Sequence, residues 1–505
     1  MHPVNLDRAA CYRALQTRDP RFDGRFFVAV RTTGIYCRPI CPAPCPKLAN
    51  IAFHRTAASA HEAGFRPCLR CRPESAPEVA ASRGTSSTVA RALARIAEGA
   101  LDGDHASVAA LAERLGIGER QLRRLFDQHL GASPIAVAQS RRVLLAKQLL
   151  HETQLKMIDV AFAAGFGSLR RFNDTFRGLY GRPPTALRRD AGTSAAPADG
   201  TCDITLSLSY VPPYDWEAIA QFFAARAIPS IEIVEPRRYR RTVTFDGCTG
   251  TIDVAPLAGR HALSATIRFA DIRSLPSIIA RIRNLFDVGS DVAAIAAQFS
   301  DDAILGRLVA ARPGLRVPGA WDPFELAVRA VLGQQITVAA ARLLAAKLVA
   351  AHGEPLAHGA DTGLTRTFPT ATHLATADLS SLGLTRARAA TLRALAAAAA
   401  SDGALFAAAG DLDATVARLR QLPGIGEWTA QYIALRALRE PDAFPAADAA
   451  LLRALSTPDG VRPTPTGLLA IAARWRPWRA YAAQHLWSRD AAPTRAARWN
   501  SEAVA

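Results

Sequence analysis

Hydrophobic and polar positions are spaced differently in different parts of the chain. In residues 88–189, and again from about residue 276 to the end, apolar residues recur at the spacing of helices. Between these stretches, Ile204–Leu208, Ala265–Phe269 and a segment near Val243 alternate as strands do. The pattern predicts a multidomain α+β protein in which helices dominate.

Two stretches rich in small polar residues predict linkers. One runs from Ser82 to Thr88, and the other, AGTSAAPADGT, runs from Ala191 to Thr201. We therefore predict a cysteine-rich domain at 1–80, a helical domain at 85–190, a linker at 191–202, an α+β domain at 203–285 and a helical domain at 286–505.

Charge indicates the kind of partner. The 505 residues carry a net charge of +17, and nearly all of the positive charge is arginine, which grips phosphate through two N–H groups. Nucleic acid is the expected partner. No apolar run reaches the length of a membrane span, and the N-terminus lacks the apolar core of a signal peptide. We expect a cytoplasmic protein without a membrane partner.

Five of the eight cysteines fall within one short stretch. In a cytosolic chain this favours a metal site over disulfides. The pairs Cys37-x3-Cys41 and Cys68-x2-Cys71 suit a tetrahedral zinc site with four cysteine ligands. A purely structural zinc site has the same spacing. Cys45 repeats the x3 spacing, and we expect it to be a bystander.

The residues around these cysteines resemble a known family. RTTGIYCRP (31–39) and GFRPCLRCRP (64–73) are similar to the N-terminal domain of Ada-type methylation-response proteins, over about residues 7–73. The resemblance implies that Cys37 both ligates Zn²⁺ and accepts a methyl group from a methyl phosphotriester in DNA. Four thiolates on Zn²⁺ carry a net charge near −2, so methylation of one should strengthen DNA binding.

The helical stretch contains two similar units. Each has a short helix, a glycine turn and a second helix, at Val108–Leu115 with Glu119–His129 and at Ile158–Ala164 with Leu169–Tyr180. This predicts helix-turn-helix units, although either alone also fits a plain helical bundle. VAFAAGFGS (160–168) and GRPP (181–184) resemble the AraC-type DNA-binding domain. The implied DNA contacts on or near the recognition helices are Arg120, Arg123, Arg170 and Arg171.

The segment LPGIGEWTA (422–430) contains a Pro-Gly-x-Gly turn between two helical patterns. Such a turn presents backbone N–H groups to a phosphate. The turn resembles that of helix-hairpin-helix glycosylases, and residues from about 205 to 490 resemble AlkA-type 3-methyladenine DNA glycosylases. YVPPYDW (210–216), VRAVLGQQ (328–335) and WRPWR (475–479) support this. The implied DNA contacts are Gly424, Gly426, Thr429 and Gln335, with Gln335 at the place of the apolar wedge.

Asp448 occupies the place of the carboxylate that stabilises positive charge on the sugar when the base leaves. Capping of a helix from Ala449 is its alternative role. An alkylated purine is cationic and favours an aromatic pocket. The residues at matching pocket positions are Trp428, Tyr432, Trp487 and Phe222. Ser488 stands where relatives carry another aromatic residue, so we expect a more open pocket.

Two features that the sequence lacks restrict which repair activities we expect. Trp428 occupies the slot of the lysine with which strand-cutting glycosylases form a Schiff base, and no lysine follows Lys347. We therefore expect a monofunctional glycosylase. The sequence has no Pro-Cys-His-Arg segment, so reversal of O6-methylguanine is not expected.

We therefore interpret the chain as a monomeric fusion of an Ada-type sensor and AraC-type regulator with an AlkA-type glycosylase. The expected partners are alkylated double-stranded DNA and promoter DNA. Two alternatives stay open: a regulator whose glycosylase half only binds DNA, and a glycosylase whose zinc module is purely structural.

Overall fold

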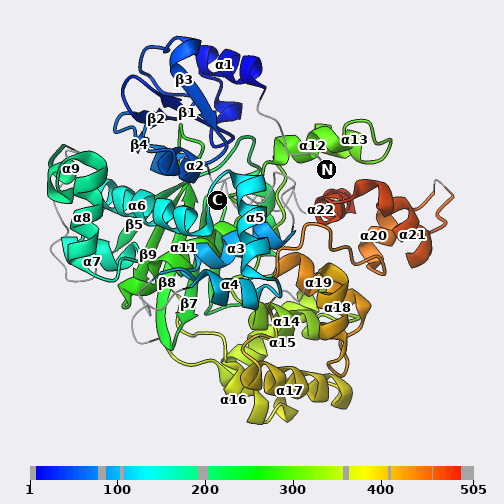
Figure 1. The fold of residues 1–505 in the computed structure, drawn as a ribbon. Helices are drawn as coiled ribbons and strands as arrows, with labels where there is room; N and C mark the ends of the chain where they lie inside the picture. The colour runs from blue at the N-terminus through cyan, green and yellow to red at the C-terminus, as the bar shows by residue number, and fades with distance from the viewer. Residues whose placement is uncertain are drawn as a thin grey trace. The chain divides into compact units, whose positions relative to one another are not determined.

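The structure is a computed structural model, shown as a ribbon in Figure 1. It describes residues 7–77, 87–102, 107–190, 203–356, 363–407, 411–457 and 459–490. The predicted linker at 191–202 lies outside these residues, as do residues 82–86 of the other linker. That linker ends earlier than predicted, because helix α3 (Ser87–Ala97) begins at Ser87.

The chain separates into two compact units. The first contains Met1–Pro212, Leu257–Arg283 and Val288–Asp291, and the second contains Pro213–Pro256, Asn284–Asp287 and Val292–Ala505. Strands and helices occur in both, which confirms the predicted multidomain α+β class. The predicted segment 203–285 contributes to both units.

The first unit begins with a four-stranded sheet in the order β3-β1-β2-β4. Its elements are α1 (Arg8–Thr17), β1 (Phe27–Val30), β2 (Ile35–Cys37), β3 (Ile51–His54), α2 (Ala57–Glu62) and β4 (Arg66–Pro67). Side chains alternate across β1, so Val28 packs with Cys11 of α1 while Ala29 packs with Tyr36. Val28 also pairs with Cys37, which is the last residue of β2 and the first cysteine of the predicted zinc site.

Seven helices follow. They are α3, α4 (Val108–Arg114), α5 (Glu119–Leu130), α6 (Pro134–Glu152), α7 (Met157–Ala163), α8 (Leu169–Tyr180) and α9 (Pro184–Asp190). The Ser107 hydroxyl caps α4, and Gly116 turns the chain with a φ of 71° that favours glycine. Leu122 and Phe126 bury one face of α5. The two predicted helix pairs are confirmed to within about one residue at each end.

Helix α6 joins the cysteine-rich part to the helical part. Lys147 Nζ donates hydrogen bonds to Glu74 Oε2 at 2.8 Å and to the Cys68 carbonyl at 3.0 Å. Both charged side chains are fully buried. A buried ion pair is tolerated only where its hydrogen bonds are satisfied, so this pair fixes how the two parts meet.

The end of α6 also contacts a strand. Strand β5 (Ile204–Ser209) pairs antiparallel with β9 (Ala262–Phe269). On the other edge of β5, the Ser207 N–H donates to Glu152 and its carbonyl accepts from Gln148, both at 2.9 Å. The side chains of α6 therefore satisfy backbone groups that a neighbouring strand would otherwise take.

The second unit contains three antiparallel strands and most of the remaining helices. The strands are β6 (Glu232–Glu235), β7 (Arg238–Phe245) and β8 (Cys248–Pro256). The first helices of this unit along the chain are α10 (Trp216–Ala224), α12 (Val292–Phe299), α13 (Leu305–Ala311), α14 (Pro323–Leu332) and α15 (Val338–His352). They are followed by α16 (Ala371–Thr376), α17 (Arg386–Ser401), α18 (Leu412–Arg420), α19 (Glu427–Arg436), α20 (Ala449–Ala454), α21 (Pro465–Ala472) and α22 (Arg479–Asp490). Helix α11 (Leu275–Leu285) crosses the boundary between the units.

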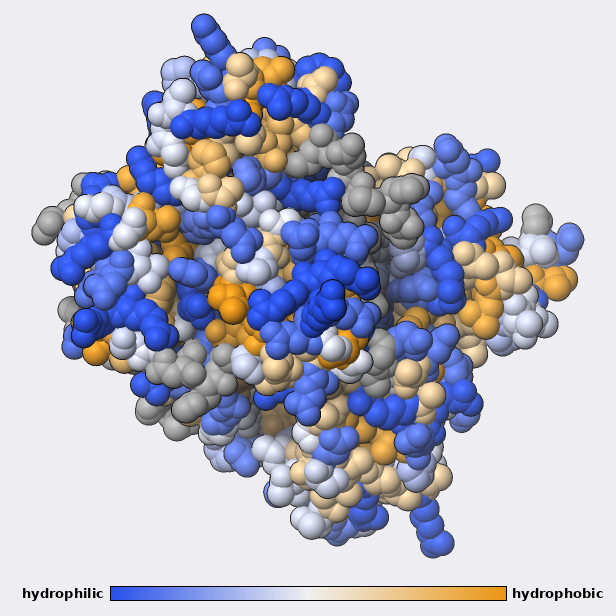
Figure 2. Space-filling model, viewed as in Figure 1, coloured by the Kyte–Doolittle hydropathy of each residue, from blue (hydrophilic) through white to orange (hydrophobic). Residues whose placement is uncertain are grey.

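One continuous apolar core holds the helices of the second unit together. Helix α14 is its centre, since nearly all of its residues are buried and it packs against α17 and α19 (Figure 1). Hydrophilic residues spread widely over the face seen in Figure 2. Among the described residues, no helix has the length and apolar character needed to cross a membrane.

The buried pair generates a stability prediction. Glu74→Gln leaves the Lys147 ammonium buried without a counter-charge, which should cost about 3–5 kcal/mol of unfolding free energy. Hydrogen–deuterium exchange should become faster in β1 and α6. All seven tryptophans follow residue 212, so tryptophan fluorescence reports on the second unit and should not change.

Two variants serve as controls. The double variant Glu74→Gln with Lys147→Met should recover much of the loss, because no charge stays buried. Glu98→Gln removes the partly exposed pair with Arg95 and should change exchange little. Equal effects of Glu74→Gln and Glu98→Gln would contradict the prediction.

Candidate functional sites

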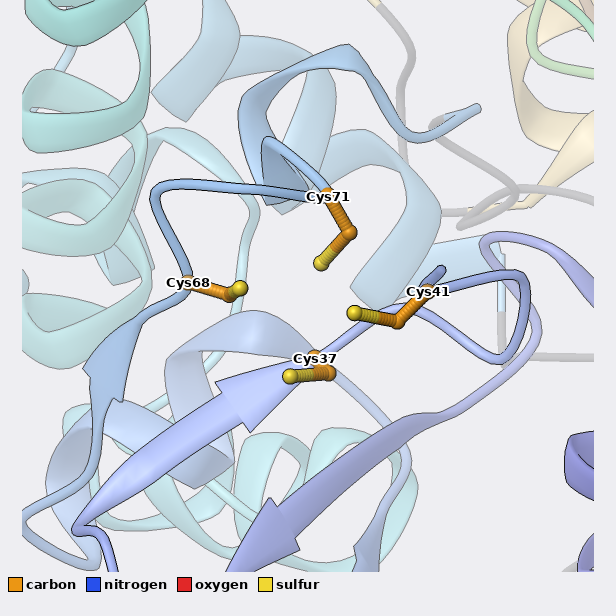
Figure 3. A group of neighbouring side chains, drawn as sticks. All are labelled: Cys37, Cys41, Cys68 and Cys71. Atoms are coloured by element: carbon orange, nitrogen blue, oxygen red, sulfur yellow. The ribbon is translucent and has the colours of Figure 1, made fainter. Parts of the chain in front are cut away.

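Four cysteines converge at one end of the small sheet, with their sulfurs facing a common space (Figure 3). Cys37 comes from β2, Cys41 from the loop after it, and Cys68 and Cys71 from the turn after β4. All four sulfurs lie within 4.8 Å of one another. A zinc ion with four sulfurs at about 2.3 Å separates them by roughly 3.8 Å, so the group fits that ion after small side-chain adjustments.

The four sulfurs differ in exposure and in hydrogen bonding. Cys41, Cys68 and Cys71 are buried, whereas Cys37 is half-buried. Backbone N–H groups donate to Cys71 from Arg38 and to Cys68 from Arg70, both at 3.4 Å.

Cys41 also receives a backbone N–H, from Ala43. Within the described residues, Cys37 receives no such hydrogen bond. An N–H donor withdraws charge from a thiolate, so Cys37 has the most available electron pair.

Two cations hold the loops that carry the cysteines. Arg38 donates to Asp23 at 2.8 Å, to Ser75 at 2.7 Å and to the Cys71 carbonyl at 3.2 Å. Lys147 holds the Cys68 carbonyl. Cys45 is exposed and stands outside the sulfur group.

The predicted arginines of the helix-turn-helix units lie on outward faces. Arg120 and Arg123 are exposed on α5, and Arg170 and Arg171 are exposed on α8. Arg123 pairs with Glu119 at 2.6 Å. The buried residues Phe172 and Phe176 occupy the other face of α8, so its exposed arginines lie outside the core.

The predicted hairpin joins α18 to α19. Gly424 has a φ of 79°, and a Cβ at this position would overlap the Thr391 hydroxyl. Gly426 is the N-cap residue of α19 (Glu427–Arg436), and no side-chain cap hydrogen bond is made to the first N–H groups of this helix. A helix start of this kind can receive a phosphate.

The turn between α14 and α15 is fixed to this hairpin. Gln334 Nε2 donates to the Gly424 carbonyl at 3.0 Å and to the Thr429 hydroxyl at 3.1 Å. Arg388 donates to the Gln334 carbonyl at 2.6 Å. Gln335, the next residue, is exposed with a φ of 58°. The sequence interpretation singled out Gln335 and missed Gln334, although both belong to the same VLGQQ segment.

Thr429 is one of the predicted DNA contacts of the hairpin. Its side chain is buried, and its hydroxyl accepts the hydrogen bond from Gln334. A hydrogen bond from Thr429 to a DNA phosphate would therefore come from its backbone N–H, which lies in the first turn of α19.

Asp448 takes the capping role and also lies among the predicted pocket residues. Its Oδ1 accepts hydrogen bonds from the Ala450 and Leu451 N–H groups, at 3.0 and 3.1 Å, and so caps α20. The Trp428 indole donates to Oδ2 at 2.9 Å, and the Trp487 indole donates to Oδ1 at 3.0 Å. Four N–H donors hold the carboxylate, and it stays half-exposed.

Aromatic rings surround this carboxylate. Trp428 and Tyr432 stack with centroids 5.4 Å apart and planes 11° apart, and Trp487 meets Tyr432 edge-on at 6.3 Å. Three of the four predicted pocket residues therefore form one cluster. Ser488, which stands where relatives carry another aromatic residue, accepts a hydrogen bond from Arg312 at 3.2 Å.

Phe222 stands apart from the other three in what it touches. The guanidinium carbons of Arg226 and Arg436 lie 3.7 and 4.1 Å from its ring centroid. At such distances each must lie over a ring face, and two guanidiniums cannot share one face. Phe222 is therefore enclosed on both faces, which restricts its predicted pocket role to the ring edge.

Family models match four successive stretches of the chain. They are the metal binding domain of Ada at residues 10–74, a helix-turn-helix domain at 111–190, the AlkA N-terminal domain at 205–322 and the HhH-GPD superfamily of base excision DNA repair proteins at 328–480.

Three relatives illustrate the similarity. A probable bifunctional transcriptional activator/DNA repair enzyme AlkA of Mycobacterium tuberculosis is 42% identical over 95% of this chain and 96% of its own length. The Escherichia coli DNA-3-methyladenine glycosylase 2 is 36% identical over 56% of this chain and 96% of itself. The Escherichia coli bifunctional transcriptional activator/DNA repair enzyme Ada is 35% identical over 28% of this chain and 37% of itself.

The hairpin generates a prediction about the second unit. Gly424→Ala combines a positive φ with the overlap on Thr391, and should lower the free energy of unfolding by about 2–4 kcal/mol. Urea unfolding followed by tryptophan fluorescence measures it. Gly426→Ala is the matched control, because its φ is −83° and its Cβ would meet open space. The control should lose about 1 kcal/mol or less. Equal losses would refute the close approach of Gly424 to Thr391.

Proposed function

This chain belongs to the family of bifunctional transcriptional activator/DNA repair enzyme AlkA proteins, and from this premise we propose that it excises alkylated purines such as 3-methyladenine from double-stranded DNA. It joins an Ada-type metal-binding module and an AraC-type helix-turn-helix regulator to an AlkA-type glycosylase. The observation that carries the proposed activity is the Asp448 carboxylate, held by two indole N–H groups beside stacked aromatic rings.

In the proposed reaction, the hairpin amides at the start of α19 bind a phosphate while the damaged base leaves the DNA stack. The base is held by Trp428, Tyr432 and Trp487. The C1′–N bond then breaks, its electron pair stays with the base, and positive charge develops on the sugar. Asp448 stabilises that charge, and a water oxygen adds to C1′ while the water's proton goes to solvent. The product is an abasic site.

The strand itself stays intact in this mechanism. A β-elimination enzyme needs an amine to form a Schiff base with C1′, and Trp428 offers only an indole N–H that is bound to Asp448. A half that only bound DNA would not require a carboxylate oriented by two tryptophans, and this favours catalysis over the binding-only alternative.

A second proposed activity rests on the cysteine site. Cys37, Cys41, Cys68 and Cys71 would hold Zn²⁺, which keeps bound sulfurs as thiolates at neutral pH. The Cys37 sulfur attacks the methyl carbon of a methyl phosphotriester, an S–C bond forms, the C–O bond breaks, and an ordinary phosphodiester leaves. The half-exposure of Cys37 and its lack of an N–H donor among the described residues favour it over the other three.

The regulator role follows from the same chemistry. Methylation removes one negative charge from the cysteine site, so contact with DNA phosphates should improve. The exposed Arg120, Arg123, Arg170 and Arg171 are the proposed contacts of the helix-turn-helix units with promoter DNA.

The glycosylase proposal predicts a large effect of Asp448→Asn. The amide keeps the size of the carboxylate, removes its charge and turns an NH₂ group toward one of the indole donors. Single-turnover release of 3-methyladenine from methylated DNA should fall by about 10²–10³. DNA affinity, measured by fluorescence anisotropy, should be retained because the hairpin is unchanged. Borohydride should trap no enzyme–DNA adduct with the wild-type protein. A near-normal rate would refute the role of Asp448, and a trapped adduct would refute the monofunctional mechanism.

The sensor proposal predicts one methyl group on Cys37, added once per molecule because a thioether is a poor leaving group. Peptide mass spectrometry after exposure to methylated DNA measures it. Cys45→Ser should keep both zinc content and methylation, whereas Cys68→Ser should lose zinc. An unmethylated Cys37 in zinc-loaded protein would support the purely structural alternative.

A further inference from the structure

One face of α19 carries three residues at a helical spacing. Trp428, Tyr432 and Arg436 are four residues apart, so they lie along the same side of the helix, over roughly 12 Å. Asp448 is bound to the first of them. The proposed base pocket therefore has a carboxylate at one end of this row and a guanidinium at the other.

Arg436 is buried and lacks a carboxylate partner among the described residues. Its Nη1 donates to the Tyr432 hydroxyl at 3.3 Å and its Nη2 donates to the Gly319 carbonyl at 3.2 Å. Its Nε has no partner in the described chain. The neighbouring Arg329 and Arg439, in contrast, pair with Glu232 and Asp287.

The isolated guanidinium stays charged. Burial, with the positive charges of neighbouring arginines, lowers the pKa of Arg436 to about 10, which leaves it protonated at neutral pH. Its face covers one side of Phe222, and Arg226 covers the other. Burying a charge without a counter-charge is costly, and such charges cluster at functional sites.

The proposed reaction gives such a charge a use. When the C1′–N bond breaks, the electron pair moves to the base, so the base becomes more negative whether it began cationic or neutral. A carboxylate beside the sugar and a cation beside the base both favour this movement.

We propose that Arg436 assists departure of the base electrostatically, as the positive counterpart of Asp448, and this inference rests on the proposed glycosylase activity. The same charge repels a cationic base before the reaction. Removing it should therefore slow cleavage of a cationic base and tighten binding of the same base. A purely structural cross-link would weaken both.

The test uses the full-length protein with Arg436→Gln and Arg436→Lys. The substrates are two duplexes, one with a single cationic 7-methylguanine and one with a single neutral hypoxanthine. Single-turnover rates are measured against enzyme concentration, which separates the maximal rate from the half-saturating concentration. Melting temperatures report on folding.

We expect Arg436→Gln to lower the maximal rate about tenfold on both substrates. Its half-saturating concentration should fall for 7-methylguanine and stay unchanged for hypoxanthine. Arg436→Lys keeps the charge and should stay within about threefold of the wild-type rate.

Maximal rates of Arg436→Gln equal to wild type would overturn the proposal. Weaker binding of both substrates, with no rescue by lysine, would overturn it in favour of a structural role. If Arg436→Gln does not fold, the lysine variant carries the test. Burial lowers the pKa of a lysine, so its rate should fall at alkaline pH where the wild-type rate does not, and parallel pH profiles would refute the proposal. A wild-type protein that releases neither base would instead refute the proposed glycosylase activity.

Discussion

The hydrogen bonds to Asp448 decide the geometry of the second unit's site. This one carboxylate caps α20 through two backbone N–H groups and receives indole N–H groups from α19 and α22. A helix cap needs an oxygen at a fixed place, and the role that we propose for Asp448 in base release needs a negative charge at that same place. Helices α19, α20 and α22 therefore meet at the Asp448 carboxylate. Their arrangement in turn sets the positions of the aromatic rings beside it.

Local signals in the sequence predicted several of the elements and the grouping of four cysteines. Strands near Ile204 and Ala265 follow from alternation, and α4, α5, α7 and α8 follow from apolar period, a serine cap or a glycine turn. The cysteine group follows from spacing alone, because short loops bring such pairs together. Capping of a helix from Ala449 was the alternative role of Asp448 in the sequence, and this cap is confirmed.

What the sequence could not predict depends on contacts between distant segments. Thr429 is buried because Gln334 reaches it from a different turn. Phe222 is enclosed because Arg436 approaches it from a helix more than two hundred residues later in the chain. Neither contact can be predicted from the spacing of residues in the sequence. The partners of such a contact can be separated by any number of residues. The same holds for Lys147 and Glu74, whose pairing exists only once the sheet meets α6.

The contact between α6 and Ser207 has a consequence for how the chain can be divided. A fragment that began after residue 202 would contain β5 but neither Gln148 nor Glu152. Its outer edge would then present an open N–H and carbonyl, the groups through which strands of separate molecules recruit one another into aggregates. In the full-length chain, Gln148 and Glu152 of α6 therefore prevent this edge of β5 from pairing with β5 of another molecule.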